Sequence, residues 1–260
     1  MNTLVIFSPR TGSTILNELL AFQQQNVDLD EFLSSSIRLG TQGVFVNNIP
    51  TDILDEVRRL NSRYKGYTPH KTNFLPKINE YGYNWSAKCY AYNKDTVKYI
   101  IETVVNSETE LFFTRRNSLK QQCWSAIMAE VREEEIKNTD TWSLHSSHVH
   151  TNKHKYPEIK LTQLDIRKAA RTIKSIILST NMVEELYKEF GGNMMVYEET
   201  IKLGDFSLAG ISDESIQKYN ALRVRMIKPD QILPEKYFSN YDEIDSLIER
   251  LIESKQNKVV

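Results

Sequence analysis

The stretch FSPRTGST, residues 7–14, decides how this chain is expected to fold. It completes a short apolar run at residues 4–7, LVIF, which has the composition of a buried strand. A helical pattern begins immediately after it. Its apolar residues recur at the helical period: Ile15, Leu16, Leu19 and Leu20. The sequence therefore predicts a strand, a tight turn and a helix in direct succession.

A turn of this kind creates a place where anions bind. The first N–H groups of a helix have no partner within the helix, and they point at one small volume. The positive end of the helix dipole lies behind them, which favours phosphate-like groups. Small residues and one cation, Arg10, suit this role. The alternative is a turn that only starts a helix, since Pro-x-x-Gly turns are common.

Length and composition are those of an ordinary globular protein. The 260 residues suffice for one α/β domain with a sizeable core, and 40% of them are apolar and 26% charged. The formal net charge is -1, with basic and acidic residues interleaved. We therefore expect no nucleic-acid partner and no attraction to an anionic membrane, and any anion site must be local.

The two cysteines and the absence of long apolar runs indicate the cellular compartment. Cys89 and Cys123 form neither a disulfide framework nor a metal pattern, so we expect both to be buried in a reducing environment. No apolar run approaches the length of a membrane span. The N-terminus has no basic region followed by an apolar core and a cleavage site. We therefore expect a cytoplasmic protein.

Strand and helix patterns alternate along the chain. Further strands are expected at residues 85–90, 111–114 and 194–197, and loops at 64–84 and 138–160. Helices are expected at residues 51–60, 94–105, about 117–137, from a capping box at Thr162 and Asp165 to Gly191, and around 244–252. This alternation predicts a parallel sheet covered on both faces, with ligands beyond the carboxyl ends of its strands.

A second strand-to-helix junction carries two arginines, Arg115 and Arg116. The helix that follows carries Ser125 on the same side as Ser118. A guanidinium and a hydroxyl in this arrangement can hold a phosphate through charge-assisted hydrogen bonds. The alternative is a solvated arginine pair at a helix start, although a cation there opposes the helix dipole.

The two junctions together resemble PAPS-dependent sulfotransferases, where PAPS is 3′-phosphoadenosine 5′-phosphosulfate. The run Pro-Arg-Thr-Gly-Ser-Thr is similar to the 5′-phosphosulfate loop of that family. The pair Arg116 and Ser125 resembles the family's 3′-phosphate element. The spacing of nine residues between Arg116 and Ser125 resembles that of the bacterial trehalose 2-sulfotransferase type. The stretch QCWSA, residues 122–126, also resembles a stretch of that type. Arg115 is the alternative to Arg116.

The resemblance implies a fold, a reaction and a set of site residues. The fold is a three-layer, P-loop-like α/β domain with a central parallel sheet, here spanning residues 1–260. The reaction moves a sulfuryl group from PAPS to a hydroxyl of a small acceptor, such as a carbohydrate, without a metal. The residues implied to bind the cofactor are Arg10, Thr11, Gly12, Ser13, Thr14, Arg116 and Ser125. Arg10 is also implied to be catalytic, because it faces the leaving oxygen.

A general base must take the proton of the acceptor hydroxyl. The segment VDLDEFL, residues 27–33, resembles the segment of the bacterial type that supplies a glutamate base, and Glu31 falls on that glutamate. The glycine and proline of that segment are missing here. The alternative is an exposed acidic cluster of Asp28, Asp30 and Glu31.

Three further signals leave alternatives open. Lys88 lies where related enzymes carry a lysine near the active site, but a lysine at a strand edge is equally consistent with the sequence. Tyr197-Glu198-Glu199 resembles the Tyr-Glu-Asp that closes a later strand of the family, which supports the fold. The run His145, His148, His150 and His154 offers zinc ligands, yet a polar loop without a rigid frame favours solvated side chains.

Two other functions compete with sulfuryl transfer. A nucleotide or small-molecule kinase of the same fold would use ATP with Mg²⁺, but the Lys-Ser/Thr pair of a Walker loop is absent. A non-catalytic nucleotide-binding protein would keep the anion site without turnover. Binding of adenosine 3′,5′-bisphosphate against ATP, and consumption of PAPS, distinguish the three.

Overall fold

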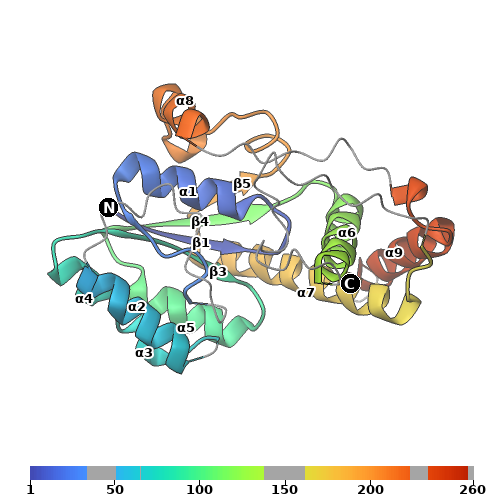
Figure 1. Ribbon diagram of the computed structural model, residues 1–260, viewed down its shortest axis with the longest axis horizontal. Helices are drawn as coiled ribbons and strands as arrows, with labels where there is room; N and C mark the ends of the chain where they lie inside the picture. The colour runs from blue at the N-terminus through green and yellow to red at the C-terminus, as the bar shows by residue number, and fades with distance from the viewer. Residues whose placement is uncertain (34–50, 65, 138–161, 223–233, 257–260) are drawn as a thin grey trace. The chain divides into compact units, whose positions relative to one another are not determined.

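The structure is a computed structural model that describes residues 1–33, 51–64, 66–137, 162–222 and 234–256 (Figure 1). It divides into two compact units. The first comprises Met1–Asn117 and Ser179–Leu222, and the second comprises Ser118–Leu178 and Arg223–Val260. A single domain over residues 1–260 stays a prediction. No helix within the described ranges is both long and apolar enough to cross a membrane.

The first unit is built on a five-stranded sheet in the order β2-β3-β1-β4-β5. The strands are β1 (Asn2–Phe7), β2 (Val27–Asp28), β3 (Trp85–Tyr90), β4 (Thr109–Arg115) and β5 (Asn193–Val196). All four pairings between neighbours are parallel, which confirms the predicted parallel sheet. The two-residue strand β2 is too short to leave a periodic pattern in the sequence.

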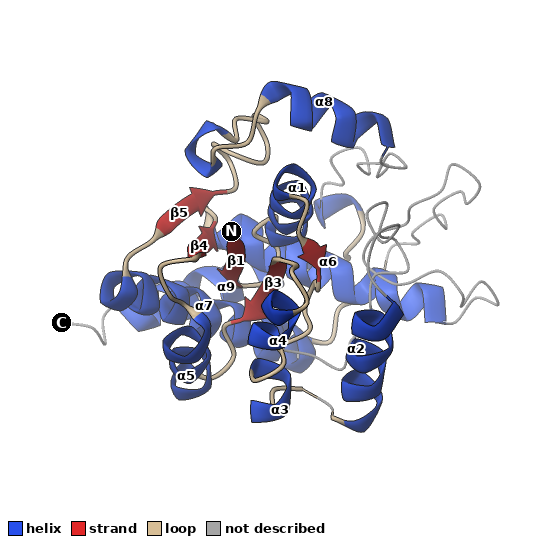
Figure 2. Ribbon diagram, turned by 90° about the vertical axis from the view of Figure 1, so that its left-hand side faces the viewer, coloured by secondary structure: helices blue, strands red, loops and turns tan. Residues whose placement is uncertain are grey.

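Helices cover both faces of this sheet. Leu4 and Ile6 of β1 pack with Ile100 of α5 (Lys94–Val104). Val5, whose side chain points to the opposite face, packs with Leu16 of α1 (Ser13–Gln24). Figure 1 shows α1 above the sheet and α5 below it, and Figure 2 shows the strands between the two helices. The predicted three-layer α/β architecture is therefore confirmed.

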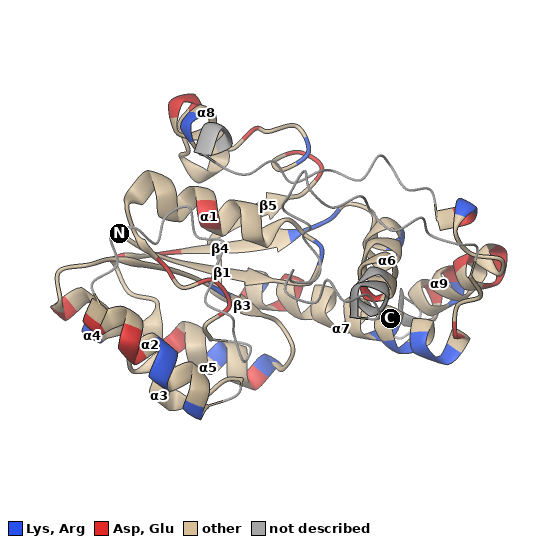
Figure 3. Ribbon diagram, in the orientation of Figure 1, with Lys and Arg blue, Asp and Glu red and all other residues tan. Residues whose placement is uncertain are grey.

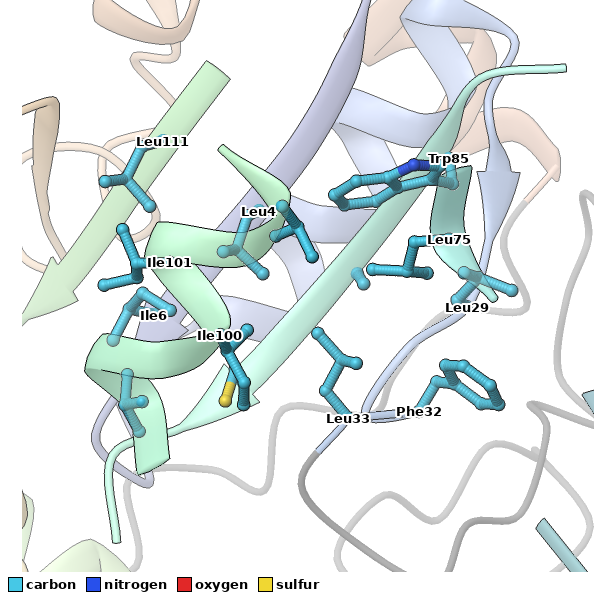
Figure 4. Close-up of a cluster of buried hydrophobic side chains, with 14 of the residues drawn as sticks. Leu4, Ile6, Leu29, Phe32, Leu33, Leu75, Trp85, Ile100, Ile101 and Leu111 are labelled. Carbon is cyan, nitrogen blue, oxygen red and sulfur yellow. The ribbon is translucent and has the colours of Figure 1, made fainter. Parts of the chain in front are cut away.

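The segment that follows β2 packs on the same face of the sheet as α5. Leu29, Phe32 and Leu33 lie in the same core cluster as Leu75 and Trp85 (Figure 4). Leu29 is 1% exposed, and Phe32 and Leu33 are fully buried. This apolar anchoring fixes the path of the chain through Asp30 and Glu31. The helix α2 (Thr51–Arg63) adds its buried stripe of Ile53, Val57 and Leu60.

The structure corrects two sequence-based expectations. Residues 64–84, expected as a loop, contain the short helices α3 (Pro69–Thr72) and α4 (Leu75–Glu80). Their prolines lie in the first turn, where a missing N–H does no harm, so they start these helices. The capping box with Thr162 is also wrong. Asp165 accepts the N–H groups of Arg167 and Lys168, whereas Thr162 pairs with Phe238 in an isolated bridge.

The end of α7 follows the predicted pattern, whereas two elements after β5 were not predicted. The helix α7 (Ile166–Phe190) ends at Gly191 and Gly192, which both have positive φ. The first unit also contains a 3₁₀ turn, η2 (Ser207–Ala209), and the helix α8 (Asp213–Leu222). Phe206 and Tyr219 from this region pack in the same core cluster as Leu16 of α1.

The second unit is helical in its described part. It contains α6 (Leu119–Lys137), the first half of α7, η3 (Pro234–Lys236) and α9 (Tyr241–Gln256). The indole of Trp124 stacks on Phe238 at 6.0 Å and on Tyr241 at 5.0 Å between ring centroids. Lys120 on α6 pairs with Asp245 on α9 at 2.7 Å. These contacts give the second unit a core of its own.

Candidate functional site

The backbone after β1 forms the predicted turn. Arg10 has a φ of 68° and Gly12 a φ of 78°, both in the left-handed region, and α1 begins at Ser13. This conformation is easy for glycine and strained for arginine. Gly12 contributes no side-chain cap, and the first turn of α1 contains no acidic residue. The helix start therefore fits a bound anion, because no side chain of its own neutralises the N–H groups.

Hydroxyl groups hold this turn in place. Ser8 Oγ lies 2.8 Å from Ser179 Oγ and 3.0 Å from Thr180 Oγ1 of α7. Thr11 Oγ1 donates to the carbonyl of Ser8 at 2.7 Å and lies 2.6 Å from Thr114 Oγ1 at the end of β4. Ser8 and Thr11 are buried. The turn is thus preorganised by contacts with both β4 and α7.

Lys88 of β3 reaches the helix start from the neighbouring strand. Its side chain is 3% exposed, and β3 pairs directly with β1. The ammonium donates to Thr14 Oγ1 at 2.7 Å and lies 2.8 Å from Asp30 Oδ1 and 3.2 Å from Glu31 Oε1. Burial alone lowers the pKa of Lys88, but the two carboxylates outweigh burial and raise it. Lys88 therefore stays charged.

The turn that carries Asp30 and Glu31 is held by β3. Lys88 N–H donates to the Asp30 carbonyl at 2.7 Å, and Leu29 N–H donates to the Ser86 carbonyl at 2.8 Å. Asp30 adopts a φ of 45°, which these contacts stabilise. The side chain of Glu31 is 33% exposed. Its carboxylate is therefore fixed beside Lys88 and still accessible to a solute.

Asp28, at the start of this turn, is a carboxyl with a raised pKa. It accepts hydrogen bonds from Asn17 Nδ2 at 2.7 Å and from the N–H of Asp30 at 2.9 Å. Burial, followed by the charge of Asp30, raises the pKa of Asp28 to about 7. Near neutral pH, Asp28 is therefore partly protonated.

Arg116 follows β4 at the same edge of the sheet as Arg10, since β1 and β4 pair in parallel. Its Nε donates to Glu198 Oε1 at 3.2 Å, and its Cζ lies 4.2 Å from the centroid of the Tyr197 ring. The other carboxylate oxygen of Glu198 accepts the N–H of Asn117 at 2.9 Å. The guanidinium is thus held by an ion pair on one edge and a ring on one face.

Tyr197 connects this arginine with the first junction. A Cβ at Gly12 would lie 3.0 Å from Cδ2 of Tyr197 and 2.6 Å from Cγ1 of Ile201, so only glycine fits there. One aromatic ring therefore lies against Arg116 and occupies the side on which a side chain at residue 12 would lie. Arg115 is the other candidate for the second cation. Its Nε is buried and has no hydrogen-bond partner within the described residues.

The expected site residues are divided between the two units. The turn from Arg10 to Thr14, Glu31 and Arg116 all belong to the first unit. Ser125 lies on α6 in the second unit, so its partnership with Arg116 stays a prediction. The histidine run at 145–154 lies outside the described residues. In the described part of the chain, no cluster of three or more His, Cys, Asp or Glu side chains could hold a metal ion.

The partners of Lys88 and Arg116 were not predicted from the sequence. Asp30 is predicted only as a member of an acidic cluster, Glu31 as the candidate base and Glu198 as part of a strand ending, and none of them as the partner of a cation. A lysine within a buried strand is the signal that could have predicted an ion pair, because a buried charge requires a partner. Cys89 and Cys123 are buried, as predicted, and burial raises the pKa of each thiol to about 12.

Comparisons with known proteins give only distant similarities. The sequence matches no protein-family model. No curated protein matches it either. Among solved structures, the chain is similar to the sulfotransferase domain of the Synechococcus PCC 7002 olefin synthase, with 10% identity, a TM-score of 0.44, and coverage of 96% of this chain and 94% of that one.

Two other solved structures are similar over most of this chain. The sulfotransferase domain from the curacin biosynthetic pathway has 16% identity and a TM-score of 0.44, covering 96% of this chain and 89% of that one. An unliganded sugar kinase from Janibacter sp. HTCC2649 has 10% identity and a TM-score of 0.35, covering 82% and 96%. Similarity this distant does not assign a function to the chain.

Proposed function

We propose that the protein is a sulfotransferase that moves a sulfuryl group from PAPS to a hydroxyl of a small acceptor. One observation carries the proposal: the turn with Arg10 and the junction with Arg116 lie at the same edge of the sheet and share the ring of Tyr197. A ligand with anionic groups at both ends of one nucleoside fits such an arrangement, and PAPS has a 5′-phosphosulfate and a 3′-phosphate.

The residues at the first junction would hold the 5′ end. The N–H groups at the start of α1 and the hydroxyls of Ser13 and Thr14 suit an anion, because no acidic side chain lies in this turn. Arg10 would offset the charge that grows on the leaving phosphate. Lys88, fixed on Thr14 Oγ1, adds a further positive charge beside the helix start. This set of donors fits a phosphosulfate without a metal ion.

The second junction would hold the 3′-phosphate. Arg116 is the first candidate, with Ser125 as its partner, and Arg115 is the alternative. A planar guanidinium can donate two parallel N–H groups to a phosphate. The 3′-phosphate distinguishes PAPS from ATP, so this junction determines the choice of nucleotide in the proposal.

Bound PAPS supplies the sulfuryl group and a phosphate leaving group. The acceptor oxygen forms a bond to sulfur while the bond between sulfur and the bridging phosphate oxygen breaks. Glu31 takes the proton of the acceptor hydroxyl, for which its carboxylate is accessible and held by Lys88. Alignment and preorganised charge provide most of the acceleration, as in phosphoryl transfer.

The test is transfer of label from radiolabelled PAPS to a mixed extract of small metabolites. We expect a labelled product that forms without added metal. Binding of adenosine 3′,5′-bisphosphate with no consumption of PAPS would favour a non-catalytic binding protein. Consumption of ATP in the presence of Mg²⁺, with no use of PAPS, would favour a kinase. Either result would overturn the proposed reaction.

A further inference from the structure

The surroundings of Arg116 assign a role to a residue that does not itself take part in the proposed reaction. We infer that Glu198 is a positioning residue, which fixes the guanidinium of Arg116 so that its remaining N–H groups bind the 3′-phosphate of the nucleotide. The inference rests on the proposed function and deepens it, because it concerns how the 3′-phosphate is selected.

The guanidinium of Arg116 binds its ligands directionally. It is planar and carries N–H donors in a fixed fork, so its direction decides which ligand it can bind. Glu198 Oε1 accepts the Nε–H at 3.2 Å, which fixes the direction within the plane. The Tyr197 ring lies 4.2 Å from Cζ, which fixes the plane itself. Neither contact uses the N–H groups of the two terminal nitrogens.

Glu198 is itself held in place by the backbone. Its Oε2 accepts the N–H of Asn117, the residue next to Arg116, at 2.9 Å. The backbone of this region continues the pairing of β4 and β5, because Tyr197 N–H donates to the Arg115 carbonyl at 2.9 Å. The chain then turns, with Thr200 N–H donating to the Val196 carbonyl at 2.8 Å. Glu198, which follows β5 closely in the chain, therefore holds Arg116 in a fixed position relative to β5.

The charge of the Glu198 carboxylate strengthens its contact with Arg116. Burial alone would raise the pKa of Glu198, but the N–H of Asn117 and the guanidinium of Arg116 lower it below its usual value. The carboxylate is therefore ionised at neutral pH and keeps a strong hydrogen bond with the arginine. The side chain of Arg116 is 13% exposed, so a nucleotide can still reach it.

Glu199 provides a matched control. It is also acidic and next in the chain, and its Oε1 accepts Asn117 Nδ2 at 3.3 Å, a contact that does not involve the arginine. Removing Glu199 changes the local charge and the contact with Asn117 and leaves the orientation of Arg116 intact. The comparison of the two glutamates therefore separates orientation from charge.

The experiment measures dissociation constants of adenosine 3′,5′-bisphosphate and of AMP, which lacks the 3′-phosphate, for the wild type and for Glu198→Ala, Glu198→Gln and Glu199→Ala. We expect Glu198→Ala to reduce the preference for the bisphosphate by about tenfold, with AMP binding unchanged. Glu198→Gln keeps an oxygen for Nε–H, so it should stay within about threefold of the wild type. Glu199→Ala should retain the preference.

The outcomes separate the inference from the proposed function. A wild type that binds AMP and the bisphosphate equally would contradict the proposed 3′-phosphate site itself. A wild-type preference that survives in Glu198→Ala, or a tighter bisphosphate complex in that variant, would overturn the positioning role alone. Equal weakening of both nucleotides would also overturn it, because the change would then act on the whole fold. Binding of AMP reports that each variant is folded.

Discussion

The buried ammonium of Lys88 and the half-buried guanidinium of Arg116 lie toward the same edge of the sheet, and carboxylates hold them in different ways. The ammonium of Lys88 has three N–H donors. Three oxygens surround it, from Thr14, Asp30 and Glu31. The guanidinium of Arg116 has five N–H donors, and its ion pair with Glu198 uses one of them. Lys88 thus connects the start of α1 with the turn that carries Asp30 and Glu31. Arg116 is instead oriented by Glu198, and this ion pair leaves the N–H groups of its two terminal nitrogens for a ligand.

This difference predicts unequal effects on stability. Lys88→Met leaves Asp30 and Glu31 without their shared cation, and we expect the free energy of unfolding to fall by about 4 kcal/mol. Arg116→Met removes a less buried pair whose carboxylate keeps the N–H of Asn117, so we expect a loss of about 1 kcal/mol. Chemical denaturation measures both. Equal losses would contradict the comparison.

Arg10 is a third cation at this edge, and it belongs to the proposed reacting centre. Arg10→Ala removes the positive charge beside the leaving oxygen, so we expect kcat to fall on the order of 10²–10³-fold. Steady-state turnover of PAPS measures this loss. Thermal unfolding of the same variant is the control, because alanine at a φ of 68° remains strained. A variant with normal turnover would remove Arg10 from the mechanism.

Glu31 tests whether the carboxylate that Lys88 holds is the base. Glu31→Gln keeps the size and an oxygen for Lys88 but cannot take a proton, so we expect kcat to fall on the order of 10²-fold. The dissociation constant of adenosine 3′,5′-bisphosphate should not change, since Glu31 is not part of the proposed nucleotide site. Turnover at the wild-type rate would exclude Glu31 as the base.

Asp28 lies beneath the same turn and makes stability depend on pH. The folded state raises its pKa from 3.8 to about 7, so the folded chain holds a proton that the unfolded chain has lost. Stability therefore falls as the pH rises between these values, and the loss is complete above about pH 7. Asp28→Asn should remove this decline, which is on the order of 4 kcal/mol. Thermal unfolding at acidic and alkaline pH measures it. A wild type with constant stability would contradict the raised pKa.

The fold was largely predictable because strand and helix periods are local properties. The strands β1, β3 and β4 and the helix α5 were found from short runs of apolar residues. The helices α3 and α4 were missed because their glycine- and proline-containing surroundings are typical of loops. Charged residues of both signs cover the outer helices α2 and α5, as the interleaved sequence predicts (Figure 3).

The site was predictable only where neighbours in sequence form it. The turn from residue 7 to residue 14 is local, and its glycine and arginine were recognised as a unit. The ion pair of Lys88 and Glu31 joins residues 57 positions apart, and that of Arg116 and Glu198 joins residues 82 apart. Such pairs depend on the order of the strands in the sheet, and the periodicity of apolar residues along the sequence does not predict that order.

The most direct test of the account measures the binding of adenosine 3′,5′-bisphosphate and of AMP to the wild type, Arg10→Ala and Arg116→Ala. If the two junctions hold the two ends of one nucleotide, Arg116→Ala weakens only the bisphosphate, whereas Arg10→Ala weakens both ligands by a similar factor. Binding of the bisphosphate that is unaffected by Arg116→Ala and Arg115→Ala alike would contradict it.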